Sequence, residues 1–262
     1  MIENIMDTLK LQPIVEQLLS TQSYRRTFSF EFEGEKLWIK QPEIGEANIW
    51  HTLALLLSKL LKNNFFKPTV VTDPKASLAY EAKKLVFLKT QGVNVPEVIL
   101  SHENYLLLKD GGVPLSTLLN QEETTFDEKM EICNKLSIAL ADMHNKGLYH
   151  SRPALRDITY REGKIYFMDF EENLESTLTH QEAIIRDGFI FVHALYRKLH
   201  SPELIAITLE NYHRSLRPDL WDNLVSEGGR YRLTYLLIRS MKRFLGKDGI
   251  AIYQTLHYFR EF

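Results

Sequence analysis

The stretch of sequence that decides the fold is residues 139–158, which read ALADMHNKGLYHSRPALRDI. A helical apolar pattern ends within it, and a polar loop begins at His150. Residues 165–170 then read IYFMDF, a short apolar strand that ends at Asp169. A helix, a loop led by histidine and a strand that ends in an acid therefore follow one another along the chain.

Upstream of this stretch, residues 26–40 predict a β-hairpin. Phenylalanines alternate with polar residues from 28 to 32, residues 33–35 form the turn, and the second strand ends at Lys40. The hairpin therefore carries a lysine at the end of its second strand.

Two helices and then two strands are expected between this lysine and residue 110. A wide apolar stripe predicts a helix over residues 44–62, and a second helix is expected from about Ser77 to Thr90. Residues 98–100 and 105–108 read as strands.

Downstream of residue 110, helices dominate. A capping box at residues 125–128 opens a helix that runs to His144, with Cys133 on its apolar side. Short strands at 158–160 and 165–168 interrupt the helical pattern before it resumes.

The expected fold is therefore α+β with two lobes. The N-terminal lobe, residues 1–110, has a small antiparallel sheet and an inserted helix after the Lys40 strand. The C-terminal lobe, residues 111–262, is helical and contains the loop that begins at His150.

Composition restricts the classes of partner. The chain has 262 residues, 44% hydrophobic and 25% charged, with a net charge of −2, so no overall charge favours nucleic acid. Its single cysteine excludes an internal disulfide and a multi-cysteine metal site.

The first residues lack a secretory pattern, and the apolar segment 49–61 is too short to span a bilayer. A cytoplasmic protein is expected, with a peripheral contact to the inner membrane through residues 44–67 as the alternative to packing of that helix.

Four residues occur in the order that phosphate chemistry needs. Lys40 ends a strand, Glu81 lies on a following helix, His150 opens a loop and Asp169 ends a short strand. Cations can contact nucleotide phosphates and carboxylates can hold Mg²⁺, because phosphoryl transfer depends mainly on positioning and charge neutralisation.

In these segments the sequence resembles the protein-kinase-like superfamily. The segments that carry the likeness are 37–40, 81–96, 139–158 and 165–170. Within the superfamily it is similar to bacterial lipopolysaccharide (3-deoxy-manno-octulosonic acid) kinases, to RIO-like kinases and to toluene-tolerance-type kinase-like proteins. The likeness extends from about residue 26 to residue 200.

The resemblance implies ATP and Mg²⁺ as cofactors. It implies that Lys40 contacts the α- and β-phosphates, that Glu81 orients Lys40 through an ion pair, and that Asp169 binds the metal. Asp157 stands where a second metal ligand is usual, and His150 matches the histidine that opens the catalytic loop. The implied arrangement brings Lys40, Asp157 and Asp169 to one nucleotide–metal cleft.

The chain departs from the family pattern at three places. No glycine-rich loop precedes Lys40, and Glu171 replaces the glycine that usually follows the Asp-Phe pair. Arg152 occupies the position of the catalytic aspartate, and an arginine stays protonated and cannot act as a base. Arg152 is expected either to bind a phosphorylated or carboxylate substrate or the γ-phosphate, or to pair with Asp169 or Glu171 and hold the site inactive.

Each candidate residue also has a plain structural interpretation. Lys40 and Glu81, taken alone, read as solvated surface residues, and Asp157 reads equally as a loop cap. His150 reads more readily as a structural hydrogen-bonding residue than as a catalyst. Asp187 is expected to brace the loop, as a helix aspartate does in kinase folds.

Three functions remain open from the sequence. The first is phosphoryl transfer from ATP to a hydroxyl of a sugar, a lipid-linked glycan or a protein. The second is a pseudokinase that binds nucleotide or a regulatory protein partner without transfer. The third is nucleotidyl transfer on the same fold.

Overall fold

The structure is a computed structural model that describes residues 2–22, 24–42, 73–175 and 177–262. It divides the chain into two compact units. The N-terminal unit ends at Gly111 and includes Asp169–Asn173, and the C-terminal unit comprises Gly112–Met168 and Leu174–Phe262. Asp169–Asn173, which the sequence analysis assigned to the C-terminal lobe, therefore groups with the N-terminal sheet.

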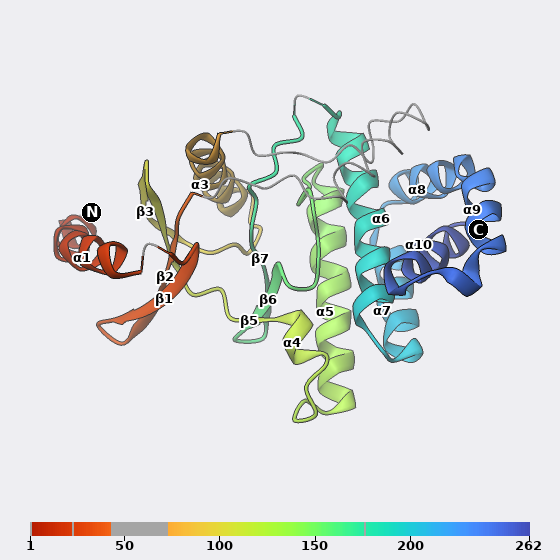
Figure 1. The fold of residues 1–262 in the computed structure, drawn as a ribbon, viewed down its shortest axis with the longest axis horizontal. Coiled ribbons are helices and arrows are strands. Elements are labelled where there is room, and N and C mark those ends of the chain that lie inside the picture. Colours follow the sequence, from red (N-terminus) through yellow and green to blue (C-terminus); the bar gives the residue numbers. More distant parts are fainter. Residues whose placement is uncertain (1, 23, 43–72, 176) are drawn as a thin grey trace. The chain divides into compact units, whose positions relative to one another are not determined.

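The N-terminal unit is built on a four-stranded antiparallel sheet (Figure 1). Its strands are β1 (Thr27–Phe32), β2 (Glu35–Lys40), β3 (Val98–His102) and β4 (Tyr105–Lys109), in the order β1-β2-β4-β3. The expected hairpin is confirmed. Its two-residue turn has φ of 50° at Glu33 and 81° at Gly34, the mirror-type geometry that suits the twist of a hairpin.

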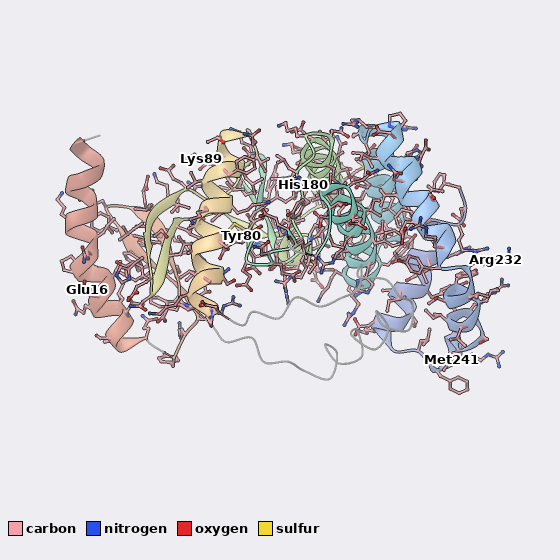
Figure 2. The ribbon with its side chains drawn as sticks, turned by 90° about the horizontal axis from the view of Figure 1, so that it is seen from above. Glu16, Tyr80, Lys89, His180, Arg232 and Met241 are labelled. Carbon is pink, nitrogen blue, oxygen red and sulfur yellow. The ribbon has the colours of Figure 1, made fainter. Side chains whose placement is uncertain are left out.

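One face of this sheet is covered by α1 (Ile2–Thr21), as Figures 1 and 2 both show. Leu11 and Val15 pack there on side chains that alternate along the strands, such as Leu37 and Ile39. The sequence analysis did not expect this helix, which contains Pro13. Apolar packing on the sheet compensates for the hydrogen bond that a proline removes from a helix interior.

Lys40 belongs to the opposite face of the sheet, because successive side chains of a strand alternate and Ile39 faces α1. That face is covered by α3 (Pro74–Thr90). The helix begins three residues before the expected start, because Asp73 caps it and Pro74 fits its first turn. Its buried side carries Glu81, so the sheet and the helix position a lysine and a glutamate toward each other.

The C-terminal unit is mainly helical, as expected (Figure 1). A small sheet contains β5 (Val113–Pro114), β6 (Ile158–Arg161) and β7 (Lys164–Phe167) in that order. The helices are α4 (Leu115–Leu118), α5 (Phe126–Asn145), α6 (His180–Lys198), α7 (Pro202–Ser215), α8 (Pro218–Arg230), α9 (Arg232–Ser240) and α10 (Lys247–Tyr258), with a 3₁₀ turn, η2 (Lys242–Phe244). The α+β fold class predicted from the sequence is confirmed.

The core of this unit forms around α5 and α6. The predicted capping box of α5 is present, since the Thr125 hydroxyl accepts from the Glu128 backbone and Glu128 accepts from the Thr125 backbone. Cys133 is buried on the inner side of α5, as expected. On α6, Gly188 allows close packing of α8, because a Cβ there would lie 2.5 Å from a methyl group of Leu224.

Within the described residues, no helix has the length and apolar character needed to cross a bilayer. The helix expected over residues 44–62, and with it the suggested membrane contact of residues 44–67, lies outside the described residues.

Candidate functional site

The N-terminal unit brings together Lys40, Glu81 and Asp169. The Lys40 ammonium lies 2.7 Å from a carboxylate oxygen of Glu81 and 2.7 Å from Oδ1 of Asp169. Lys40 is only 8% exposed and Glu81 only 1% exposed. The ion pair that the family resemblance implies is therefore present and buried, and the reading of both residues as solvated surface groups is wrong.

Glu81 also fixes the segment that contains Asp169. Its Oε1 accepts a hydrogen bond of 3.3 Å from the backbone N–H of Phe170. One turn earlier on α3, the Ser77 hydroxyl donates to the backbone oxygen of Glu171 over 3.2 Å. The first turns of α3 therefore hold residues 169–171 against the end of β2.

Asp169 has an unusual backbone conformation. Its φ is +64°, in the left-handed region that non-glycine residues seldom occupy. Such strain persists only where surrounding contacts impose it, and it is frequent at functional sites. Here the side chain is held by Lys40 and the next amide by Glu81.

Glu171 adds a third carboxylate to the cluster. Its side chain pairs with Arg26, which precedes β1, and lies 3.5 Å from the Lys40 ammonium. The residue that replaces a glycine of the family pattern therefore places a charge beside the predicted nucleotide lysine. The sequence analysis did not select Arg26, since a cation before a strand has no distinguishing pattern.

The charges of this cluster shift the pKa of both buried partners. Burial lowers the pKa of an ammonium, yet attraction to Glu81, Asp169 and Glu171 outweighs it and raises the pKa of Lys40. Burial, together with repulsion from Asp169 and Glu171, raises the pKa of the Glu81 carboxyl although Lys40 opposes the shift. The two shifts have different main causes: the three carboxylates raise the pKa of Lys40 against burial, and burial itself raises the pKa of Glu81.

The same carboxylates match the chemistry of a hard divalent cation. Oxygen atoms of Glu81, Asp169 and Glu171 all lie within 4.8 Å of one another. Mg²⁺ prefers oxygen ligands and is usually held by one or two carboxylates together with substrate phosphates. The donor set therefore fits the Mg²⁺ that the resemblance implies.

The C-terminal unit holds the loop that begins at His150. Asp187 on α6 is fully buried, and its carboxylate accepts the backbone N–H groups of His150 and Ser151. The expectation that Asp187 braces the loop is confirmed. Asp187 also lies 3.4 Å from Nε2 of His144, a buried ring at the end of α5.

His150 is buried and packs edge-on against Phe167. Its Nδ1 accepts a hydrogen bond of 3.3 Å from the backbone N–H of Arg152, which leaves the ring proton on Nε2. Ser151 between them has φ of +85°. The ring thus supports a strained loop, which agrees with the structural interpretation of His150.

Arg152 lies beside Asp157 within this loop. Nε of Arg152 is 3.4 Å from Oδ2 of Asp157, and Nε of Arg156 is 3.4 Å from Oδ1. Asp157 is 8% exposed, and its backbone oxygen accepts the N–H of Met168 over 2.8 Å. The arginine at the catalytic-base position therefore pairs with the predicted second metal ligand.

The structure thus distributes the predicted residues over the two units. Lys40, Glu81 and Asp169 meet in the N-terminal unit, and His150, Arg152 and Asp157 share one loop of the C-terminal unit. The convergence of Asp157 with Lys40 and Asp169 remains a prediction.

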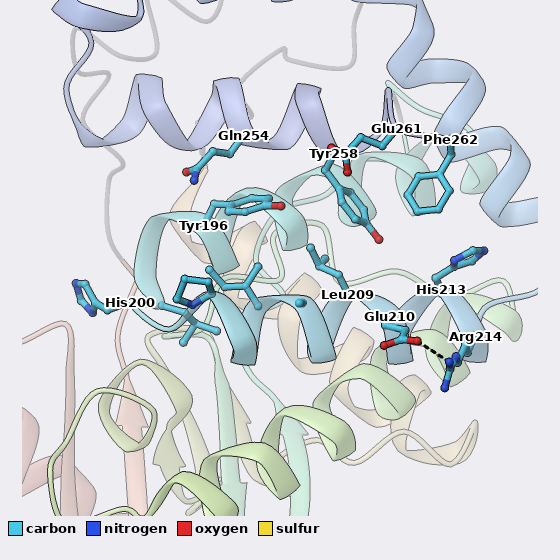
Figure 3. Close-up of a pocket in the computed structure, with 14 residues that line it drawn as sticks. Tyr196, His200, Leu209, Glu210, His213, Arg214, Gln254, Tyr258, Glu261 and Phe262 are labelled. Atoms are coloured by element: carbon cyan, nitrogen blue, oxygen red, sulfur yellow. Dashed lines mark ion pairs between the residues drawn. The ribbon is translucent and has the colours of Figure 1, made fainter.

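A separate groove of about 790 Å³ lies in the C-terminal unit between α6, α7 and α10 (Figure 3). Burial raises the pKa of its two tyrosines, Tyr196 and Tyr258, which are therefore neutral phenols at neutral pH. Glu210 and Arg214 form an ion pair of 2.5 Å at its rim. The lining includes none of the residues predicted from the sequence to be functional.

Comparison with known proteins gives two relatives in sequence. The chain is 30% identical over 249 residues to an uncharacterized protein of Haemophilus influenzae, and the match covers 95% of each chain. It is 25% identical over 142 residues to the KEOPS complex subunit Bud32 of Pyrococcus abyssi, with 53% of this chain and 64% of Bud32 covered. No protein-family model matches the chain.

Among solved structures, a MAP kinase of Leishmania major aligns with 81% of this chain and 71% of its own, at 12% identity and a TM-score of 0.38. The similarity to Bud32 agrees with the resemblance of the sequence to the protein-kinase-like superfamily. A special closeness to the lipopolysaccharide or RIO-like kinases remains a prediction.

Proposed function

This chain belongs to the family of the uncharacterized Haemophilus influenzae protein, and from its lysine–carboxylate cluster we propose that it is an atypical ATP- and Mg²⁺-dependent phosphotransferase. The acceptor is a hydroxyl group of a sugar, of a lipid-linked glycan or of a protein. A lipopolysaccharide-kinase-like acceptor is the member of this set that the sequence resemblance favours.

The observation that carries the proposal is the buried ammonium of Lys40, held 2.7 Å from Glu81 and 2.7 Å from Asp169. An ion pair with so little exposure is costly to form and contributes little net stability. The ion pair nevertheless holds an oriented ammonium beside carboxylates in the folded chain. That combination neutralises and positions a polyphosphate, which accounts for most of the catalysis of phosphoryl transfer.

The residues of the cluster have distinct roles in this proposal. Lys40 donates to the α- and β-phosphate oxygens, and Glu81 keeps the ammonium in place. Asp169 is the principal ligand for Mg²⁺, with Glu171 as an additional carboxylate, and Asp157 is the proposed second ligand. Bound Mg²⁺ supplies neutralisation of the phosphate charge.

The absence of an acid at position 152 lowers the expected rate. General-base assistance contributes roughly 10²–10⁴-fold, and the guanidinium of Arg152 cannot provide it. Asp157 binds a metal only when it releases Arg152, which lies 3.4 Å away. We therefore propose a slow enzyme in which nucleotide binding and loop rearrangement are linked.

The test is transfer of the γ-phosphate of ATP, measured with and without Mg²⁺ in the presence of candidate hydroxyl acceptors and by autophosphorylation. Asp169→Asn abolishes transfer and keeps nearly the same side-chain shape. The matched control is Asp142→Asn, at an exposed carboxylate on α5 that pairs with Lys146. The mass of the modified product separates a phosphate from a nucleotidyl adduct. Transfer that is equal in Asp169→Asn and in the control would refute the proposal.

The second candidate is a pseudokinase, and the pairing of Arg152 with Asp157 is the observation that favours it. In this case Arg152 stays paired with Asp157 in the loop. The protein then binds nucleotide or a regulatory partner without phosphoryl transfer. Nucleotide binding that depends on Asp169, together with no transfer to any acceptor, distinguishes this candidate from the enzyme.

A further inference from the structure

The last helices of the C-terminal unit expose an apolar face. Tyr231 immediately precedes α9 and Tyr235 lies in its first turn, and both side chains are buried. Leu233, Leu236 and Leu237 lie on the opposite side of the helix, because their positions differ from the tyrosines by about half a turn. They are 81%, 46% and 62% exposed. The leucine side chains of α9 are therefore exposed to solvent.

The apolar face continues into the next turn of chain. Met241 follows α9 and is 48% exposed, and Phe244 at the end of η2 is 85% exposed. We call these five side chains the outer apolar face: Leu233, Leu236, Leu237, Met241 and Phe244. Single exposed apolar residues are ordinary, but a contiguous group marks a surface that another phase or molecule covers.

The part of the chain that carries this face is rich in basic residues. Residues 230–247 contain six basic residues and no acidic residue, although the whole chain has a net charge of −2. The six are Arg230, Arg232, Arg239, Lys242, Arg243 and Lys247. Figure 2 labels Arg232 and Met241, which stand at the two ends of α9. Two of the six are engaged within the unit, because Arg230 pairs with Glu227 over 2.8 Å and the Lys242 ammonium lies 4.6 Å from the centre of the Tyr253 ring. Arg232, Arg239, Arg243 and Lys247 remain as exposed cations that neighbour the apolar face in the sequence.

This combination selects the class of partner. A nucleic acid is bound mainly through its phosphates, so it would contact the cations but not a row of exposed leucines. A short helix with leucine and phenylalanine on one side and basic residues at its borders is typical of contact with an anionic bilayer surface. Nine residues of α9 are too few to span a bilayer.

We propose that α9 and η2 form a docking surface for an anionic lipid membrane. The outer apolar face enters the boundary between headgroups and acyl chains, and the neighbouring cations contact lipid phosphates. This surface is separate from the lysine–carboxylate cluster of the N-terminal unit, so the proposal does not depend on phosphoryl transfer.

The test is sedimentation of the full chain with vesicles of phosphatidylcholine and phosphatidylglycerol, compared with vesicles of phosphatidylcholine alone. Binding is expected to the anionic vesicles only and to decrease with added salt, because the attraction is screened. Phe244→Gln weakens binding about ten-fold, as expected for loss of one buried aromatic side chain. Arg239→Glu weakens it at least about five-fold.

Matched controls lie elsewhere on the C-terminal unit. Ile138→Gln removes an apolar side chain that is 49% exposed on α5, and Lys198→Glu reverses an exposed charge at the end of α6. Both leave vesicle binding unchanged. Equal binding to neutral vesicles, or equal losses in the controls, overturns the proposal. So does a chain that ignores vesicles but binds duplex nucleic acid, or that dimerises in solution and becomes monomeric in Phe244→Gln.

Discussion

Replacement of Lys40 by methionine separates the charge of the ammonium from its packing. The change leaves the carboxylates of Glu81, Asp169 and Glu171 without their shared cation in a site where Glu81 is 1% exposed. Removing one partner of a buried ion pair costs about 3–5 kcal/mol, because the remaining charge stays desolvated. We expect Lys40→Met to destabilise the N-terminal unit by this amount.

Two further changes identify the cause of that loss. In the double variant Lys40→Met with Glu81→Gln, the buried charge is gone and the amide oxygen can still accept from Phe170, so we expect about 2 kcal/mol to be regained. The single variant should also gain stability as pH falls. Burial raises the pKa of Glu81, so between its unfolded value of about 4.3 and the raised folded value the folded state binds more protons, and stability decreases as pH rises.

The assay is hydrogen exchange of the backbone amides of β2 and β4, which reports on the N-terminal unit by itself. Lys109→Met is the matched control, because Lys109 lies on β4 and pairs with Glu35 at the surface over 3.1 Å. We expect less than about 1 kcal/mol for that change. The reasoning is refuted if Lys40→Met costs no more than the control, or if the double variant is as unstable as the single one.

Three other results are expected. Glu171→Gln breaks the pair with Arg26 at a partly exposed position, so thermal unfolding should show a loss of less than about 1 kcal/mol, together with weaker stabilisation by Mg²⁺. Asp187→Asn weakens the hydrogen bonds to two loop amides, so urea unfolding should show a free energy of unfolding lower by about 2–4 kcal/mol. Hydrogen exchange of the loop amides should be faster, and unchanged exchange would exclude the bracing role. Cys133 is buried and its pKa is raised by burial, so a thiol reagent should modify the unfolded chain rapidly and the folded chain only slowly.

Local sequence patterns predicted most of the secondary structure. The turn at Glu33-Gly34 and the capping box at Thr125 specify their elements through contacts between near neighbours, and both are present. Helix α1 was not expected, because its stability comes from packing of Leu11 and Val15 on the sheet rather than from its own sequence.

The candidate site was predictable only in part. Lys40, Glu81 and Asp169 were identified by their order along the chain, and their ion pairs lie where that order implied. The pairing of Glu171 with Arg26 and that of Arg152 with Asp157 join residues whose partners no local pattern indicates. Both pairings depend on the folded backbone outside regular helices and strands, so no spacing rule for those elements encodes them.

The most direct test of the central claim is calorimetric titration of the full chain with ATP, with and without Mg²⁺, in parallel with Asp169→Asn. The account predicts saturable binding that requires Mg²⁺ and is strongly weakened in the variant, since Asp169 is the proposed metal ligand beside Lys40. Absence of binding to the parent chain, or binding that neither Mg²⁺ nor Asp169→Asn alters, would contradict it.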